Sequence, residues 1–358
     1  MTSKRSASQP LPGNAGTVSP RKRATINDIA RLAGVSKKTV SRVINRSPFV
    51  KVETRDKINA LMKELGYRPD PQARGLAFRR SFLIGMIYDN PNPQYVVNVQ
   101  QGILDAVRDS GFELVVHPCN RAAPGFLEQV RTFVEQLKLF GVVLTPSVSE
   151  DDDLVAILRE VDCPYVRVAS VSLDEAARMI VTHDAAGAAE AARHLADLGH
   201  RRVAFISGPP SFRSSHERRR GFAEGLAERG LTLEDRYVIE GAYTFESGVA
   251  CARQLLSMNP PPTAIFTGND EMAAGVYTAA REAGVAIPEK LSVVGYDDSP
   301  MAARLWPPLT SVRLPIRDMG RYAAEKLIEL ASSEAVEAAR YPEVRPGLAV
   351  RESTAQAR

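Results

Sequence analysis

The chain of 358 residues has a formal net charge of only +4, and 44% of its residues are hydrophobic, as in ordinary globular proteins. No apolar run reaches the ~18 residues that a membrane-spanning helix needs, and no hydrophobic signal core opens the chain, so we expect a cytoplasmic protein without a membrane partner. Three widely spaced cysteines without a CxxC pair, and five histidines without metal-ligand spacing, indicate neither a disulfide framework nor a metal site.

The charge is unevenly distributed. Residues 1–80 hold 18 of the 46 Lys and Arg residues but only 5 of the 42 Asp and Glu residues, a balance of +13, whereas the rest of the chain carries −9. A basic head on an acidic body indicates that the head binds a polyanion and the body does not.

The head follows a tail, 1–23, that is rich in Ser, Pro, Gly and Ala and basic, which predicts disorder. Residues 25–45, TINDIARLAGVSKKTVSRVIN, then predict two short helices joined by a tight turn. Thr25 and Asp28 are spaced as in a capping box, Gly34 suits the positive φ at the end of a helix, and Ser36 suits the N-cap of the next helix.

The second of these helices is expected to face Val40, Val43 and Ile44 inward and its polar residues outward. A third helix at about 53–65 repeats the apolar spacing with Ile58, Leu61, Met62 and Leu65. Residues 24–69 therefore predict a helix-turn-helix domain that places one helix in a DNA major groove. The alternative is a generic three-helix bundle with a basic surface.

Residues 70–80 predict a short linker. Asp70 can cap a helix and Pro71 suits its first position, so 71–78 could form one or two helical turns. Such a short helix, with Gly75 inside it, would be marginal alone and would need DNA or a partner chain.

From residue 81 onward, apolar strands alternate with amphipathic helices. The predicted strands lie at 82–88, 113–117, 141–144, 165–168, 202–207, 264–266 and 291–296. The predicted helices lie at about 95–110, 125–139, 185–198, 218–229, 247–256, 270–283 and 316–331. This alternation predicts two doubly wound parallel-sheet subdomains with a ligand between them, at the carboxyl ends of the strands.

An ordered set of motifs resembles the lac/galactose repressor family of bacterial transcription regulators over nearly all of 24–354. Besides the head motif, they are GYRPD followed by ARGLA, GHRRVAFISGP, ERRRGF, FTGNDEMAAGV, LSVVGYDDSP, PPLTSVR and VRES. The resemblance implies a homodimer on a pseudo-palindromic operator and a core, 81–354, similar to periplasmic sugar-binding proteins. By the same analogy the first subdomain holds about 81–182 plus 314–332, and the second about 183–313 plus 333–354.

The resemblance also implies a set of DNA-binding residues. Lys37, Lys38 and Arg42 are expected to read bases, with phosphate binding as the alternative. Leu76 matches the hinge leucine that wedges into the minor groove, the alternative being packing against its dimer mate. Thr39, Ser41 and Asn45 are expected to contact phosphates or pack the helix, and the expected DNA-binding set also includes Thr25, Ser36 and Arg74.

In the core, the resemblance implies an effector site formed by Asp89, Tyr95, Arg218, Tyr243, Asn269 and Asp297. The alternatives are a surface salt bridge for Arg218, a helix cap for Asn269, a turn cap for Asp297 and rim positions for the two tyrosines. Leu314 stands where many sugar-responsive relatives have glutamine. Trp306 is expected to be a packing residue.

Nothing in the sequence indicates an enzyme or a cofactor: GxGxxG and Walker motifs are absent, and no nucleophile is paired with a base. The resemblance to the family implies a sugar-inducible repressor of carbohydrate-use genes. The alternatives are a regulator co-repressed by a purine-like effector and, more remotely, a solute-binding protein.

Overall fold

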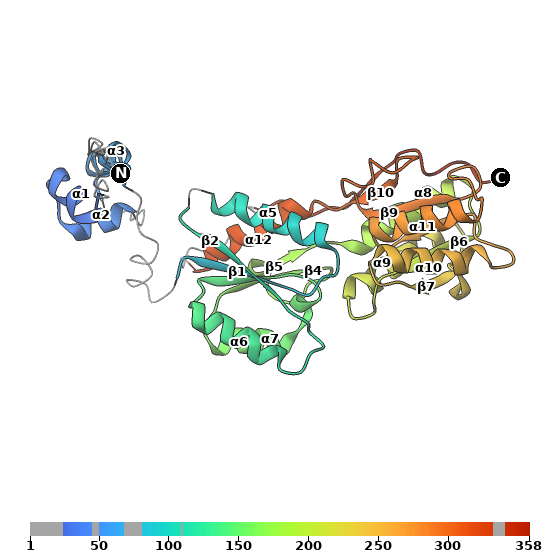
Figure 1. Cartoon of the computed structure of the whole chain (residues 1–358), viewed down its shortest axis with the longest axis horizontal. Helices are drawn as coiled ribbons and strands as arrows, with labels where there is room; N and C mark the ends of the chain where they lie inside the picture. Colours follow the sequence, from blue (N-terminus) through green and yellow to red (C-terminus); the bar gives the residue numbers. More distant parts are fainter. Residues whose placement is uncertain (1–23, 45–49, 68–80, 109, 332–340) are drawn as a thin grey trace, which may run out of the picture. The chain divides into compact units, whose positions relative to one another are not determined.

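The computed structural model describes residues 24–44, 50–67, 81–108, 110–331 and 341–358. They fall into two compact units, one before and one after the boundary between residues 73 and 74, and each unit is described by itself (Figure 1). Among the described residues, no helix is long and apolar enough to cross a membrane.

The first unit consists, where it is described, of helices α1 (Ile26–Ala33), α2 (Lys37–Ile44) and α3 (Val52–Glu64). They share a small apolar core in which Ile29, Val40 and Ile58 are completely buried. The third helix ends one residue before Leu65, whose side chain is exposed. The prediction that Leu65 faces the core was wrong. The helix ends at Glu64, so the helical spacing that turns every third or fourth residue toward the core does not extend to Leu65.

The local signals in this unit act as predicted. The Thr25 amide donates to the Asp28 carboxylate at 3.0 Å and the Asp28 amide donates to the Thr25 hydroxyl at 3.4 Å, which completes the capping box. Gly34 ends α1 with φ of 70°. The Thr39 amide donates to the Ser36 hydroxyl oxygen at 3.1 Å and so caps α2. These short-range bonds fix where the two helices meet.

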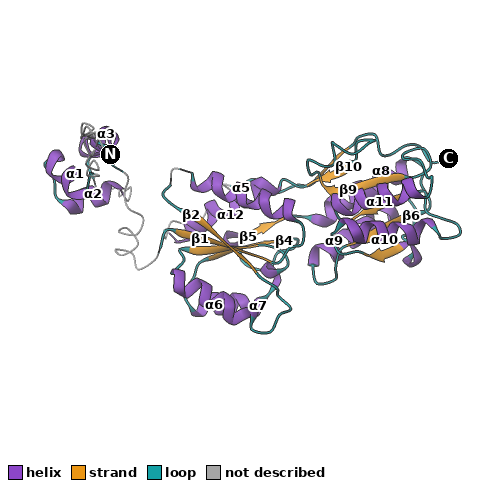
Figure 2. Cartoon of the chain, in the orientation of Figure 1, coloured by secondary structure: helices purple, strands orange, loops and turns teal. Residues whose placement is uncertain are grey.

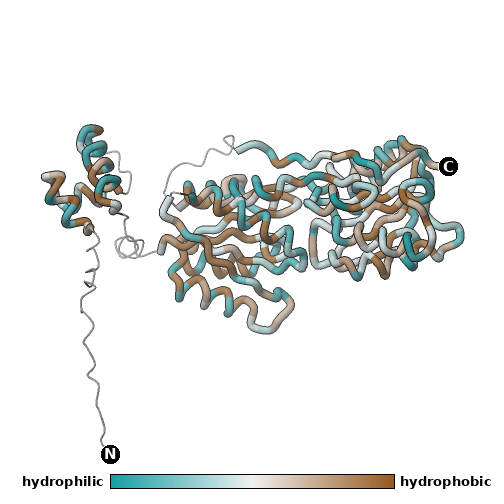
Figure 3. Tube along the Cα trace, turned by 45° about the horizontal axis from the view of Figure 1, so that its top comes forward, coloured by the Kyte–Doolittle hydropathy of each residue, from teal (hydrophilic) through white to brown (hydrophobic). Residues whose placement is uncertain are grey.

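The second unit contains two sheets (Figure 2). The first sheet is parallel and has the order β2-β1-β3-β4-β5. Its strands are β1 (Leu83–Tyr88), β2 (Glu113–Pro118), β3 (Gly141–Leu144), β4 (Tyr165–Ala169) and β5 (Met179–Val181). The central strands β3 and β4 are buried along their whole length, as expected for strands covered on both faces. Hydrophobic and hydrophilic segments alternate along this unit, in brown and teal in Figure 3.

Helices cover both faces of this sheet: α5 and α12 lie on one face, and α6 and α7 lie on the other (Figure 1). Their bounds are α5 (Pro93–Val107), α6 (Phe126–Leu137), α7 (Asp152–Glu160) and α12 (Ile316–Ala331), with short 3-10 turns η1 (Val148–Glu150) and η2 (Ala176–Arg178). We call this part the first subdomain.

The second subdomain is built on a sheet of order β11-β10-β9-β8-β6-β7, parallel except for β11. Its strands are β6 (Val203–Ser207), β7 (Val238–Glu240), β8 (Ala264–Thr267), β9 (Ser292–Asp297), β10 (Thr310–Arg313) and β11 (Gly347–Ala349). The helices are α8 (Asp184–Asp197), α9 (Arg213–Ala227), α10 (Phe245–Leu256) and α11 (Asp270–Glu282), with the turn η3 (Asp235–Tyr237). The doubly wound architecture is therefore confirmed.

The chain crosses between the subdomains more than once. It leaves the first sheet after β5 to enter α8, and it returns after β10 so that α12 packs beside α5. Strand β11 then closes the second sheet, so the chain crosses again between residues 331 and 347. These crossings place polar loops from both subdomains at the carboxyl ends of the parallel strands.

Candidate functional site

The exposed side of α2 carries positive charge. Lys37, Lys38 and Arg42 are exposed, whereas Val40 and Val43 on the same helix are buried. The predicted outward and inward faces of this helix are thus confirmed. The structure contains no DNA, so the contacts of these side chains stay a prediction.

Some of the other residues predicted to bind DNA lie on or beside α1 and α2, and some lie outside the described residues. The hydroxyls of Ser36 and Thr39 lie 2.9 Å apart at the start of α2, Ser41 is half-buried on that helix, and the Thr25 side chain belongs to the capping box. Asn45, Arg74 and Leu76 lie outside the described residues, as do the predicted tail 1–23 and the whole linker 70–80.

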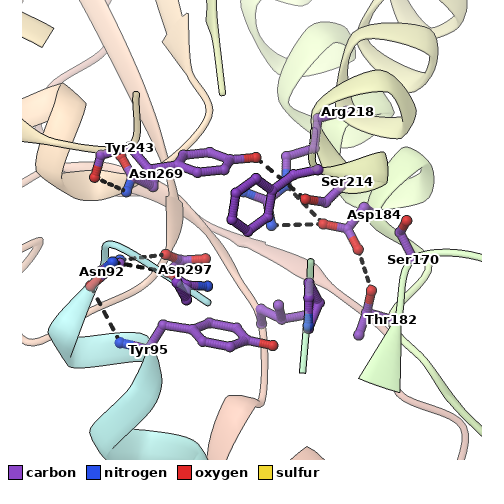
Figure 4. A pocket seen from close by; sticks show the side chains of 14 residues that line it. Asn92, Tyr95, Ser170, Thr182, Asp184, Ser214, Arg218, Tyr243, Asn269 and Asp297 are labelled. Atoms are coloured by element: carbon purple, nitrogen blue, oxygen red, sulfur yellow. Dashed lines mark hydrogen bonds and ion pairs between the residues drawn. The ribbon is translucent and has the colours of Figure 1, made fainter. Parts of the chain in front are cut away.

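A pocket lies between the two subdomains, and we call it the inner pocket (Figure 4). Five of the six predicted effector residues line it: Tyr95, Arg218, Tyr243, Asn269 and Asp297. Leu314 also lines it. The lining residues that sequence reasoning missed are Asn90, Asn92, Pro146, Ser170, Thr182, Asp184, Phe212 and Ser214.

Arg218 is the most strongly held polar side chain of the inner pocket. It projects from α9, is only 6% exposed, and donates through Nε and Nη2 to the Asp184 carboxylate at 2.7 Å (Figure 4). Its guanidinium also donates to the Gly268 carbonyl and stacks 3.7 Å from the centroid of the Tyr296 ring. The surface salt bridge considered as an alternative was wrong, since the ion pair is buried.

Asp184 supplies the negative charge of this pair. It begins α8, is 1% exposed, and accepts a further hydrogen bond from the Thr182 hydroxyl. Burial alone would lower the pKa of the Arg218 guanidinium, but the Asp184 carboxylate raises that pKa well above its ordinary value. The Arg218 guanidinium therefore stays charged inside the protein. The only sequence signal for Asp184 was an acidic residue directly before a predicted helix.

Asn269 and Tyr243 are held together by hydrogen bonds within the protein. The Asn269 side chain accepts from the Met272 amide at 3.0 Å, which caps α11, and donates to the Tyr243 carbonyl at 2.9 Å. The helix-cap interpretation of Asn269 is thus confirmed. The Tyr243 hydroxyl lies 2.8 Å from the Ser215 hydroxyl, and its ring meets Phe212 edge-on. Tyr243 is 6% exposed, so it is a buried wall and not a rim residue.

Two residues that line the inner pocket carry hydroxyl groups without a hydrogen-bond partner among the described residues. The Tyr95 hydroxyl and the Ser170 hydroxyl are buried, and no hydrogen-bond partner for either lies within the described residues. An unsatisfied buried hydroxyl costs free energy, so both atoms favour a polar ligand in the pocket. On the opposite wall, Asp297 ends β9 with φ of 102° and accepts from the Asn92 side chain at 3.4 Å (Figure 4). That bond joins the two subdomains.

The inner pocket is nearly closed in this structure. Its volume is about 30 Å³, whereas one water molecule needs roughly 10–15 Å³. A ligand the size of a sugar ring can enter only if the subdomains move apart or the lining side chains rearrange.

Asp89, the sixth predicted effector residue, does not line the inner pocket. Its carboxylate accepts from the Arg121 amide at 2.9 Å and faces a second, larger cavity whose walls include Arg121, Ser147, Glu150 and Arg213. We call this cavity the outer chamber. No group of three or more His, Cys, Asp or Glu side chains that could hold a metal ion lies within the part of the chain that the structure describes.

Two buried carboxyl groups predict an unusual dependence of stability on pH. Burial raises the pKa of Asp270 to about 7 and that of Asp297 to about 8. The folded chain then keeps protons that the unfolded chain has released above its carboxyl pKa of about 4, so these groups lower the free energy of unfolding progressively as pH rises from about 4 to about 8. Above that window their effect is constant.

Urea denaturation across this range checks the prediction. Asp297→Asn removes one titrating group and should gain stability relative to the unmodified chain as the pH increases. The difference between the two proteins is the relevant quantity, because His194 and His200, whose pKa values burial lowers, titrate in the opposite sense. The exposed Asp153→Asn variant is the control, and a difference for Asp297→Asn that is constant with pH would contradict the prediction.

The comparisons with known proteins agree with this architecture. The family model described as "Bacterial regulatory proteins, lacI family" matches residues 25–70, and the model "Periplasmic binding protein-like domain" matches residues 192–354. The HTH-type transcriptional repressor PurR of Photobacterium profundum is 33% identical over 333 residues, which cover 92% of this chain and 98% of that protein. The chain belongs to the LacI family.

Solved structures of LacI-family proteins have the same fold. A complex of the transcriptional regulator CelR with cellobiose has a TM-score of 0.69 at 32% identity, covering 92% of this chain and all of that chain. The lac repressor dimer bound to operator and the anti-inducer ONPF has a TM-score of 0.72 at 29% identity, covering 93% and 100%. As a LacI-family member, the protein is a DNA-binding transcription regulator.

Proposed function

We propose that this protein is a sugar-inducible repressor of carbohydrate-use genes. The observation that carries the proposal is the lining of the inner pocket, which includes the unpartnered hydroxyls of Tyr95 and Ser170 and the carboxyl of Asp297. A ring that bears several hydroxyls can both donate to and accept from such a set. Leu314 offers no hydrogen bond, so the side of the effector that it meets is the less polar one.

The proposed mechanism is linkage between effector and DNA. The Asn92–Asp297 hydrogen bond joins the subdomains across the inner pocket, and the Arg213 amide donates to Glu150 at 3.0 Å across the cleft. An effector that inserts between these contacts favours one arrangement of the subdomains over the other. It thereby biases the dimer away from the state in which both heads fit the operator.

Each part of the chain has a proposed role. Residues 24–69 read one operator half-site through Lys37, Lys38 and Arg42, and 70–80 form a hinge in which Leu76 contacts the minor groove and Arg74 contacts the DNA. Thr25, Ser36, Thr39, Ser41 and Asn45 contact phosphates or support the helices. Residues 81–354 bind the effector and dimerise. Because it acts on the chromosome, we place the protein in the cytoplasm, and we assign it no catalytic activity.

Exposed apolar side chains support a homodimer on a pseudo-palindromic operator. Trp306 is 85% exposed, so the expectation that it packs within the chain was wrong. Val97 and Leu104 on α5 are also more than 40% exposed. We expect the double variant Leu104→Arg/Trp306→Arg to halve the apparent mass in light scattering, since buried charge opposes association. A full-size particle would contradict these residues as the interface, and Val350→Arg, at another exposed apolar site, is the control.

The function is tested by titrating the purified protein on its own upstream DNA with a panel of sugars and purines. Release by a sugar supports the proposal. Tighter binding with a purine would instead make the protein a co-repressed regulator, and a panel without effect on specific binding would contradict small-molecule control by these classes.

A further inference from the structure

The cleft between the subdomains contains more space than a single sugar ring in the inner pocket would use. The outer chamber has a volume of about 670 Å³, which falls within the range of roughly 300–1,000 Å³ that is usual for ligand pockets. Its walls come from both subdomains, as do those of the inner pocket. Nothing in the proposed function uses this chamber.

The two cavities share their walls. Neighbouring residues of one loop face different cavities: Asp89 lines the outer chamber and Asn90 the inner pocket. Likewise, Ser147 and Arg213 line the outer chamber while Pro146 and Ser214 line the inner pocket. Because two loops and the first turn of α9 form this common wall, a ligand that extends out of the inner pocket past it enters the outer chamber.

The chemistry of the outer chamber combines acceptors and donors. One oxygen of Glu150 accepts from the Arg213 amide, whereas the other, Oε1, is buried without a hydrogen-bond partner within the described residues. Burial raises the pKa of this carboxyl group. The exposed Arg213 guanidinium makes no hydrogen bond or ion pair to any described residue. An acceptor and a donor that lack partners thus face one cavity from opposite subdomains.

The charges of the chamber disfavour an anionic ligand. Arg121 is paired with Asp151 at 3.0 Å and Glu217 with Arg220 at 2.5 Å, which leaves Arg213 facing the two carboxyl groups of Asp89 and Glu150. A phosphate or a uronate would meet more negative than positive charge there. A neutral group with several hydroxyls can donate to Glu150 and accept from Arg213 at once.

We propose that the effector is a neutral oligosaccharide of at least two units, with one ring in the inner pocket and the next in the outer chamber between Glu150 and Arg213. This inference rests on the proposed function and names its ligand class. A second unit held from both subdomains adds contacts that depend on their arrangement, so it strengthens the response as well as the affinity.

The test compares monosaccharides with disaccharides built from them, as release of the full-length protein from its upstream DNA in fluorescence anisotropy. The probes are glucose against cellobiose and maltose, galactose against lactose, and xylose against xylobiose. We expect one disaccharide to act at a concentration roughly tenfold or more below that of its monosaccharide, as the loss of a hydrogen bond to a charged group implies.

Two variants locate the second unit. Arg213→Ala removes the donor, and Ser211→Trp fills the chamber from an exposed position on its wall. Both should raise the disaccharide concentration needed for release about tenfold or more and leave a monosaccharide response unchanged. Arg219→Ala is the matched control, because Arg219 lies on the same helix, pairs with Asp235 and lies outside the chamber.

The outcomes separate this inference from the proposed function. If monosaccharides act as well as disaccharides, or if both chamber variants respond to the disaccharide normally, the outer chamber holds no second unit while sugar induction stands. If no sugar in the panel releases the DNA and a purine tightens binding, both the proposed function and this inference are wrong.

Discussion

Replacing Arg218 with methionine is expected to lower the free energy of unfolding by about 3–5 kcal/mol, because the carboxyl group of Asp184 would remain buried without its partner. Arg218 is only 6% exposed and Asp184 only 1%. The variant also loses the stacking of the guanidinium on the Tyr296 ring. Urea denaturation followed by circular dichroism measures the loss, and a change below 1 kcal/mol would mean that the pair contributes little to the folded state.

The double variant Arg218→Met/Asp184→Asn separates stability from effector binding. It removes both charges, so it should regain most of the lost stability. Arg218 and Asp184 both line the inner pocket, so the double variant should bind operator DNA normally and fail to release it with effector. A double variant that is stable and still inducible would remove Arg218 from the proposed effector site.

Arg42→Ala is expected to weaken specific operator binding by about 1–3 kcal/mol, roughly tenfold to hundredfold, while sparing much of the binding to unrelated DNA. The physical reason is that a guanidinium on the exposed side of α2 can contact a guanine through two hydrogen bonds at once. Anisotropy titrations with operator and scrambled duplexes at one salt concentration measure the ratio of the two dissociation constants for each protein.

Lys63→Ala is the control for Arg42→Ala, since it removes one exposed positive charge from the end of α3 in the same unit. It should reduce binding to both duplexes slightly or not at all. Equal losses on operator and scrambled DNA for Arg42→Ala would instead assign Arg42 to a phosphate.

Much of the fold follows from interactions between residues close together in the chain. The capping box of Thr25 and Asp28, the positive φ of Gly34 and the apolar spacing in the helices all act over three or four residues. Strand β3 has the predicted bounds because a fully buried parallel strand is a continuous apolar run. Helix α9, however, begins at Arg213, five residues before the predicted start, since its first turn carries no strong local signal.

The elements that sequence reasoning missed are stabilised by distant partners. Strands β5, β7 and β11 are only three residues long, and β10 has four. Too short to show a periodic pattern, they exist because they extend sheets that other strands have formed. Helix α7 was missed as well, although Asp151 caps it by accepting from the Leu154 amide.

The sequence by itself determined the class of this protein: a basic helical head, a doubly wound core and five residues of the inner pocket. Only the tertiary structure decided which distant polar groups form hydrogen bonds and ion pairs. Arg218 meets Asp184 from 34 positions away, Glu150 meets Arg213 from 63, and Asn92 meets Asp297 from 205. Helix and strand signals depend on neighbours along the chain, whereas burial, pairing and cavity shape depend on which distant loops the sheets bring together.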